Sequence, residues 1–341
     1  MIDLKSMSQQ EITDLMRSLG QPAFRGKQVF VWLHKGARSF EEMTNLPKPL
    51  RESLAQTCQL APPKVARKQI SRQDGTIKYL WELADGNCIE SVLMRYHHGN
   101  TVCISSQVGC RMGCAFCAST IAGKVRNLTP AEMLDQVLFT QLDSGLEISN
   151  IVLMGIGEPM DNLDAVLKFL ELVNHPDGMN IGMRHISLSP CGIIPGINRF
   201  ANEPEQFTLA VSLHSAIQPI RNEIMPHVAR QSLKSLRSSL ERYIEKTNRR
   251  VTFEYLLIQD VNDTQEDLDA LIKYCRGLLC HVNLLPMNDI EGSYFAATPQ
   301  KTVKHWLDSL EKHHIEATLR SSRGSDIAGA CGQLKNKQGS H

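Results

Sequence analysis

From residue 101 onward, short runs rich in β-branched and aromatic residues alternate with amphipathic helical runs. This alternation is typical of right-handed βαβ units, in which each new strand lies parallel to the previous one. Six or seven such units can be read from the sequence, fewer than the eight of a complete barrel. We therefore expect an α/β fold built as an open, partial barrel. The expected strands are 101–106, 150–154, 185–189, 207–212, 252–257, 282–285 and 316–320, and the expected helices are 129–142, 163–173, 233–245, 265–278 and 302–312.

The first hundred residues lack this rhythm. Residues 1–60 are predicted to form a small helical accessory domain, because Ser8 and Glu11 have the spacing of a capping box and an apolar helical pattern follows. Residues 61–100 are predicted to form a β-hairpin extension, because two Asp-Gly pairs separate alternating segments. We assign 101–334 to the barrel and expect 335–341 to be a disordered tail.

Composition restricts the location of the protein and its partners. No apolar run approaches the roughly 20 residues of a membrane helix, and the first residues lack the apolar core of a signal peptide. We therefore expect a cytoplasmic protein with no membrane partner. Of its ten cysteines, the clustered ones are expected to serve as metal ligands or catalysts rather than to form a disulfide framework. Residues 1–100 hold 14 Lys and Arg against 10 Asp and Glu, whereas the rest holds 23 against 26. The N-terminal part is thus the better candidate for contacting nucleic acid.

Three cysteines directly after the first barrel strand give the strongest chemical signal. Cys110, Cys114 and Cys117 form a CxxxCxxC loop, and thiolates are the usual ligands of iron–sulfur clusters. Three thiolates leave one iron of a cubane cluster open for a substrate or cofactor. A structural zinc site is the alternative, but zinc prefers four ligands in two pairs and the sequence has no second CxxC.

This loop resembles that of the radical S-adenosylmethionine (SAM) superfamily, and its neighbours narrow the match. Together with the segments 103–110, 155–159, 212–215 and 330–334, it resembles the RlmN/Cfr family of adenosine methyltransferases in order and spacing, from about residue 24 to 334. The resemblance implies a partial barrel of the radical SAM type with one 4Fe–4S cluster, held by the three cysteines, and SAM on the open iron. Ser189 is followed by Pro190, where the family pattern has threonine, which affects the fine geometry of that pocket.

The resemblance also assigns roles to individual residues. It implies that Cys331 is methylated during turnover, that Cys103 resolves the resulting protein–RNA link, and that Glu90 accepts a proton. The residues that it implies for SAM binding are Gly157, Glu158, Ser189, Ser212, Leu213, His214 and Asn288.

Simple chemistry adds two expectations about these positions. Glu158 can accept a hydrogen bond from an ammonium group, and Arg320 and Arg323 should lower the pKa of the Cys331 thiol. Without the resemblance, the segment around Glu158 could be a simple turn and His214 a core histidine. Cys191 is treated as structural, although it falls near the expected mouth of the barrel.

The implied reaction consumes two SAM molecules per turnover. One methylates Cys331, and the second is cleaved reductively to a radical that activates this methyl group for addition to adenine. The implied partners are 23S rRNA, some tRNAs and a reducing electron-donor system, and the implied product carries a methyl on carbon 2. Two alternatives stay open: methylation at carbon 8, as in the Cfr-type reaction that protects ribosomes against antibiotics, and a non-enzymatic, metal-containing RNA-binding protein.

Overall fold

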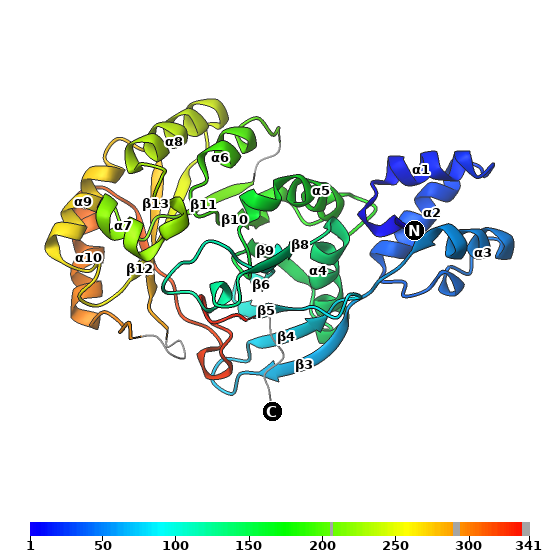
Figure 1. Ribbon diagram of the computed structural model, residues 1–341, viewed down its shortest axis with the longest axis horizontal. Helices are drawn as coiled ribbons and strands as arrows, with labels where there is room; N and C mark the ends of the chain where they lie inside the picture. The colour runs from blue at the N-terminus through cyan, green and yellow to red at the C-terminus, as the bar shows by residue number, and fades with distance from the viewer. Residues whose placement is uncertain (205–206, 289–293, 336–341) are drawn as a thin grey trace.

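Seven parallel strands in sequence order form the wall of an open barrel (Figure 1). The computed structural model describes residues 1–204, 207–288 and 294–335. The expected strands are all confirmed, and the fold class with them. Their bounds are β6 Gly99–Cys103, β9 Ile148–Leu153, β10 Ile186–Leu188, β11 Thr208–Ser212, β12 Val251–Leu257, β13 Cys280–Pro286 and β14 Ala317–Leu319.

Helices cover the outside of this wall (Figure 1). The five expected helices are confirmed, and two seven-residue helices, α6 and α7, were not predicted. Their bounds are α4 Pro130–Ser144, α5 Leu163–Asn174, α6 Ile194–Phe200, α7 Gln218–Ile224, α8 Leu233–Thr247, α9 Gln265–Cys275 and α10 Gln300–Lys312. Because all seven strands run in one direction, the loops that follow them meet at one end of the barrel.

An antiparallel meander extends the same sheet beyond β6. It consists of β3 Lys64–Ile70, β4 Ile77–Glu82 and β5 Cys88–Tyr96. The predicted turns are confirmed: Gly75 and Gly86 have φ of 71° and 80°, a region that glycine enters without steric cost. The final order runs from β14 at one edge to β3 at the other, so the barrel stays open.

The N-terminal helices pack against the side of the barrel near α4 and α5 (Figure 1). They are α1 Gln9–Ser18, which begins with the predicted Ser8–Glu11 capping box, α2 Phe24–His34 and α3 Lys48–Thr57. A short parallel pair, β1 Ile2–Asp3 with β2 Cys58–Gln59, joins the two ends of this segment. Its apolar residues merge with the main core, and the buried Lys5 pairs with the buried Asp135 of α4.

Two further segments close the mouth of the barrel. A small hairpin, β7 Gln107–Gly109 with β8 Lys124–Asn127, flanks the cysteine loop and the 3-10 helix η3 Ala118–Thr120. Residues 321–335, which we call the C-terminal strap, cross the opening from β14 toward β5 and include the 3-10 helix η7 Ser325–Ile327. The Lys335 N–H donates to Glu90 Oε2 at 2.8 Å. The rest of the segment expected to be a disordered tail, 336–341, lies outside the described residues. Among the described helices, none has the length and apolar character needed to cross a bilayer.

Candidate active site at the mouth of the barrel

Two glycine turns and hydrogen bonds to its backbone hold the cysteine loop in place. The loop begins at Gly109, whose φ is 71°, and turns again at Gly113, whose φ is 65°. The Ala115 N–H donates to the carbonyl of Ile224 at 3.0 Å, and the Thr120 hydroxyl donates to the carbonyl of Cys117 at 2.9 Å. These bonds place all three thiols on the wall of one cavity.

That cavity has a volume of about 850 Å³ and lies over the C-terminal ends of the strands. The three cysteines line one part of its wall, with Phe116 and Met112 beside them. The rest of its lining comes from the parallel strands and from the loops that follow them. It includes Gly155, Gly157, Ser189, Cys191, Ser212, His214, Glu254, Leu256 and Met287.

The donor set fits an iron–sulfur cluster. Burial raises the pKa of the Cys110 and Cys117 thiols to about 12, and thiols in such surroundings become thiolates when a metal replaces the proton. Among the described residues, no three His, Cys, Asp or Glu side chains are grouped to hold a single metal ion. Three thiols on the wall of a cavity that polar side chains also line can accommodate a cluster and a ligand beside it.

Glu158 is turned away from this cavity. The side chain is fully buried, Oε1 accepts the Met160 N–H at 2.9 Å, and Oε2 accepts the Cys191 N–H at 2.7 Å. Burial raises the pKa of this carboxyl to about 7 despite these bonds. Each oxygen thus already accepts one backbone N–H, and the predicted contact with an ammonium group would use the remaining lone pairs of the carboxylate. In this structure, Glu158 ties the loop after β9 to the loop after β10.

Ser189, Ser212 and His214, three further residues expected to bind SAM, line this cavity. Ser189 and Ser212 end neighbouring strands, and their hydroxyls lie 3.3 Å apart. His214 has a φ of 55° and lies edge-on to Phe116, with ring centroids 4.7 Å apart. Its Nδ1 accepts the Leu256 N–H at 3.0 Å, and burial lowers its pKa to about 3. The ring is therefore neutral and carries its proton on Nε2.

Leu213 and Asn288 lie elsewhere. Leu213 is buried, and its N–H donates to the carbonyl of Glu254 at 3.0 Å. Asn288 Nδ2 donates to the carbonyl of Cys331 at 3.2 Å, and Asn288 Oδ1 accepts the Ser322 hydroxyl. Asn288 thus fixes the strap rather than lining the cavity of the three cysteines.

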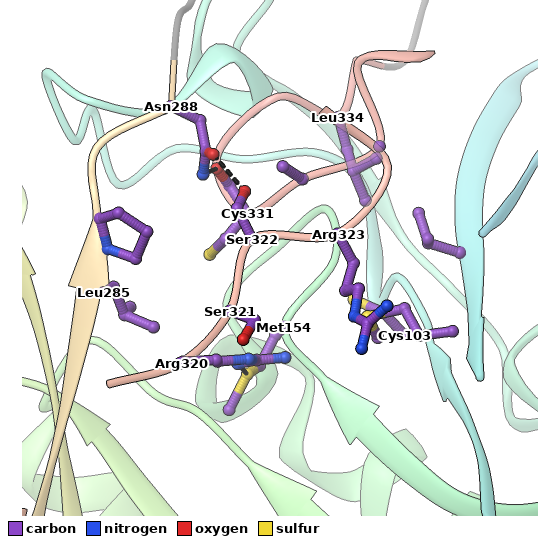
Figure 2. A pocket seen from close by; sticks show the side chains of 15 residues that line it. Cys103, Met154, Leu285, Asn288, Arg320, Ser321, Ser322, Arg323, Cys331 and Leu334 are labelled. Carbon is purple, nitrogen blue, oxygen red and sulfur yellow. Dashed lines mark hydrogen bonds between the residues drawn. The ribbon is translucent and has the colours of Figure 1, made fainter. Parts of the chain in front are cut away.

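A second pocket, of about 540 Å³, opens directly beside the first. Its lining includes Cys103, Cys331, Arg320, Arg323 and Asn288, and Figure 2 shows Cys331 and Cys103 on different sides of the same space, with Arg320 below. Cys331, Met154 and Leu285 line both pockets. Cys331 therefore lies at the junction between the cysteine-loop cavity and a pocket that contains a second thiol.

The pKa of the Cys331 thiol is raised and not lowered as predicted, and that of Cys103 is raised as well. Cys331 is exposed as a residue, but its sulfur points into the pocket (Figure 2), and burial raises its thiol pKa although the charge of Arg320 opposes this. Burial likewise raises the pKa of Cys103 to about 12, again against Arg320. The predicted lowering of the Cys331 pKa is wrong because desolvation outweighs the guanidinium, and Arg323 stacks over Tyr96 instead.

Glu90 lies on β5 beneath the strap. It is buried, with Oε1 at 3.0 Å from Lys78 Nζ and Oε2 accepting the Lys335 N–H. Lys78 Nζ also donates to the carbonyl of Ala328 at 3.2 Å. Burial raises the pKa of Glu90, opposed mainly by the charge of Lys78. The ion pair fastens both ends of the segment that carries Cys331, and Glu90 is not among the described residues that line either pocket.

The structure adds residues that sequence reasoning missed. Glu254 lines the cysteine-loop cavity from the middle of β12, and Cys191 packs against the cysteine loop although it was expected to be only structural. The signal for Glu254 was present, since it is the one charged residue in the otherwise largely apolar run 251–257. A carboxylate in a buried strand needs a partner or a ligand.

Comparison with known proteins agrees with this geometry. Residues 2–60 match the model of the ribosomal RNA large subunit methyltransferase N-terminal domain, and residues 104–275 match the radical SAM superfamily. A probable dual-specificity RNA methyltransferase RlmN of Alkaliphilus metalliredigens is 47% identical over 336 residues, covering 98% of this chain and 96% of the relative. Its counterpart in Clostridium beijerinckii is 48% identical over 335 residues, covering 98% and 95%.

A solved structure shows the same fold. The radical SAM methyltransferase from Sphaerobacter thermophilus superposes with a TM-score of 0.93 at 40% identity, covering 98% of this chain and 99% of that one. Membership of the superfamily implies an iron–sulfur cluster and SAM. With nearly half of its residues shared with these methyltransferases over almost its whole length, and with their fold, the chain belongs to the RlmN family of the radical SAM superfamily.

Proposed function

We propose that the protein methylates carbon 2 of an adenosine in 23S rRNA and of an adenosine in some tRNAs, in the cytoplasm and with electrons from a cellular reductant. Carbon 2 of adenine is electrophilic and its C–H bond is unactivated, so a simple polar transfer from SAM lacks the nucleophile that it needs. The observation that carries the proposal is the position of Cys331, at the junction of the three-thiol cavity and the pocket of Cys103.

Cys110, Cys114 and Cys117 would hold one 4Fe–4S cluster with one iron open to SAM. When bound, the cluster supplies the electron that cleaves SAM reductively, which yields a radical able to take a hydrogen atom from a methyl group. Ser189, Ser212 and His214, which line the cavity, would bind SAM through their side chains. Gly157, Glu158 and Leu213 would position the backbone of the loops that contact SAM.

Cys331 would carry the methyl group taken from a first SAM, and the second SAM would activate it. Asn288 holds the carbonyl of Cys331, which fixes the backbone of this cysteine at the junction of the pockets. Once this carbon has joined adenine, the Cys103 thiolate attacks the sulfur of Cys331. Before this attack, the radical adduct gives one electron back to the cluster and loses the proton of carbon 2. A sulfur–sulfur bond then forms and the bond between the Cys331 sulfur and the exocyclic carbon breaks, with its electron pair staying on that carbon, which takes up a proton to become the methyl group. An external thiol reduces the disulfide.

Proton removal from adenine carbon 2 falls to Glu90 in this proposal. Its carboxyl is next to Leu334, which lines the pocket, and its burial raises its pKa, as a general base requires. Oε2 of Glu90 accepts the Lys335 N–H and keeps a further lone pair that can take the proton.

The test is a Cys103→Ala variant, reconstituted anaerobically and incubated with SAM, reductant and RNA. Alanine cannot attack sulfur, so the protein should stay linked to RNA through Cys331. A denaturing gel with and without ribonuclease, followed by peptide mass spectrometry, detects this adduct.

Cys331→Ala should give neither adduct nor product, and Cys280→Ala, on the first residue of β13, serves as the matched control. Normal turnover by Cys103→Ala without an RNA-linked species would refute the proposed roles. An adduct at Cys191 would assign the methyl-carrying role to that cysteine instead.

A further inference from the structure

Glu254 is a buried carboxylate with an unused oxygen in the cysteine-loop cavity. Only 2% of the residue is exposed. Oε1 accepts a hydrogen bond from Asn283 Nδ2 at 3.1 Å, whereas Oε2 accepts none from any residue that the structure describes. An unsatisfied buried acceptor costs free energy, so a donor is expected to arrive with the ligand.

The neighbours of Glu254 do not supply that donor. Ser212, which pairs with Glu254 across β11 and β12, has its hydroxyl next to that of Ser189. Arg320 lies near enough to lower the pKa of Glu254 but forms no ion pair with it among the described residues; its Nη1 contacts Met154 Sδ at 2.9 Å. Desolvation still raises the pKa of Glu254.

The place of Glu254 in the sheet indicates which part of a ligand it meets. The loop after β9, with Gly155 and Gly157, lies three strands away, because the order is β9, β10, β11, β12. Neighbouring strands are about 4.8 Å apart, so the path along the sheet is about 14 Å. The short methionyl chain of SAM cannot cover that distance. If its amino-acid end is anchored at the β9 loop, its nucleoside half lies over β11 and β12.

We propose that Glu254 Oε2 accepts a hydrogen bond from a ribose hydroxyl of SAM. This inference rests on the proposed use of SAM and adds a binding residue on the nucleoside side of the cavity. It also separates the two carboxylates of the site: both oxygens of Glu158 are taken by backbone N–H groups, whereas Glu254 keeps one free for the ligand. A carboxylate is an acceptor only, which matches the vicinal hydroxyls of a ribose.

The test is calorimetric binding of SAM, and of its 2′-deoxy and 3′-deoxy analogues, to the cluster-loaded protein. The wild-type protein should bind one of the deoxy analogues about tenfold to hundredfold more weakly than SAM, as expected for a lost hydrogen bond to a charged group. Glu254→Gln should bind SAM more weakly and should discriminate much less between SAM and that analogue. Glu316→Gln, an exposed glutamate at the far end of the barrel, is the matched control.

The outcomes separate this inference from the proposed function. Equal discrimination by wild-type and Glu254→Gln proteins would overturn the role of Glu254 while leaving SAM binding intact. Discrimination against an analogue without the adenine amino group, lost in Glu254→Gln, would also overturn it by moving the contact to the base. Failure of the wild-type protein to bind SAM would refute the proposed function itself. If Glu254→Gln does not fold, Glu254→Asp, which shortens the side chain, is predicted to lose the same discrimination.

Discussion

At the residue scale, two buried glutamates near the same cavity are oriented differently. Both oxygens of Glu158 accept backbone N–H groups, whereas Glu254 lines the cavity and has one oxygen without a hydrogen bond from any described residue. The cysteine loop could be placed at the mouth from the sequence, because it directly follows a strand, whereas Cys103 and Cys331 were assigned by the family resemblance alone. The sequence could not tell that Glu158 turns away from the cavity or that Glu254 turns into it. Motif spacing fixes the position of a residue along the chain, whereas the direction of its side chain depends on which backbone N–H groups lie beside it.

The effect of Arg320 on the pKa of the Cys331 thiol can be tested. Burial raises the pKa of Cys331 and Arg320 opposes the rise, so Arg320→Gln should raise that pKa further and reduce the thiolate fraction at pH 8. Each unit of pKa is about tenfold in thiolate, and alkylation by iodoacetamide should slow accordingly.

Anaerobic alkylation followed by peptide mass spectrometry measures this rate at Cys331. Arg323→Gln is the control, because Arg323 lines the same pocket but stacks on Tyr96 at 5.2 Å. Equal slowing in both variants would show that Arg320 has no specific effect on the thiol.

At the element scale, the strands were predictable and the short connecting elements were not. The seven parallel strands were predicted from apolar runs of strand length. The helices α6 and α7 have only seven residues each, about two turns, which is too short for an apolar pattern of helical period to be recognised in the sequence. The C-terminal strap also lacks any periodic pattern. It is ordered by contacts with distant segments: the carbonyl of Gly332 accepts the Ala118 N–H, and that of Leu334 accepts the Ser119 hydroxyl.

The Lys78–Glu90 pair should determine how firmly this strap is held. Glu90→Gln removes the buried charge that pairs with Lys78 and weakens the acceptor for Lys335. Loss of a charge-assisted hydrogen bond should speed amide exchange in residues 328–335 about tenfold to hundredfold.

Hydrogen exchange with mass spectrometry, at an iron content equal to that of the wild type, measures this effect. Glu82→Gln, in the same meander, should leave the exchange unchanged. If Glu90 acts only as a proton acceptor, its variant will lose methylation with no change in exchange, and the fastening role would be disproved.

At the scale of the whole molecule, the separate character of the first hundred residues was visible in the sequence, but their place in the fold was not. The helical segment shares its core with the barrel and is joined to α4 by the Lys5–Asp135 pair, a contact between residues far apart in the chain. The meander places β3 at the free edge of the sheet, with Lys64 and Arg67 exposed. The turn after β3 also contacts the strap that carries Cys331, since the Gly324 N–H donates to Asp74 at 3.0 Å.

The β3 edge is therefore a candidate RNA-contacting surface on the sheet that also carries the pocket residues Val92, Met94 and Cys103. The double variant Lys64→Glu with Arg67→Glu should weaken RNA binding across sequences and reduce the slope of log affinity against log salt by about two. Filter binding at several salt concentrations measures this slope. Lys301→Glu with Lys304→Glu, on the outer face of α10, carries the same charge change and should leave the slope as it is. If the two double variants reduce the slope equally, RNA binding depends only on the net charge of the protein and the β3 edge has no specific role.

The most direct measurement identifies the methylated atom. The reconstituted protein is incubated with a 23S rRNA fragment, SAM and a reductant, and the RNA is digested to nucleosides for chromatography and mass spectrometry. We expect 2-methyladenosine from the wild-type protein and none from Cys331→Ala. A methyl group found only on carbon 8, or RNA without any methylated adenosine despite a loaded cluster and bound SAM, would contradict the proposed function.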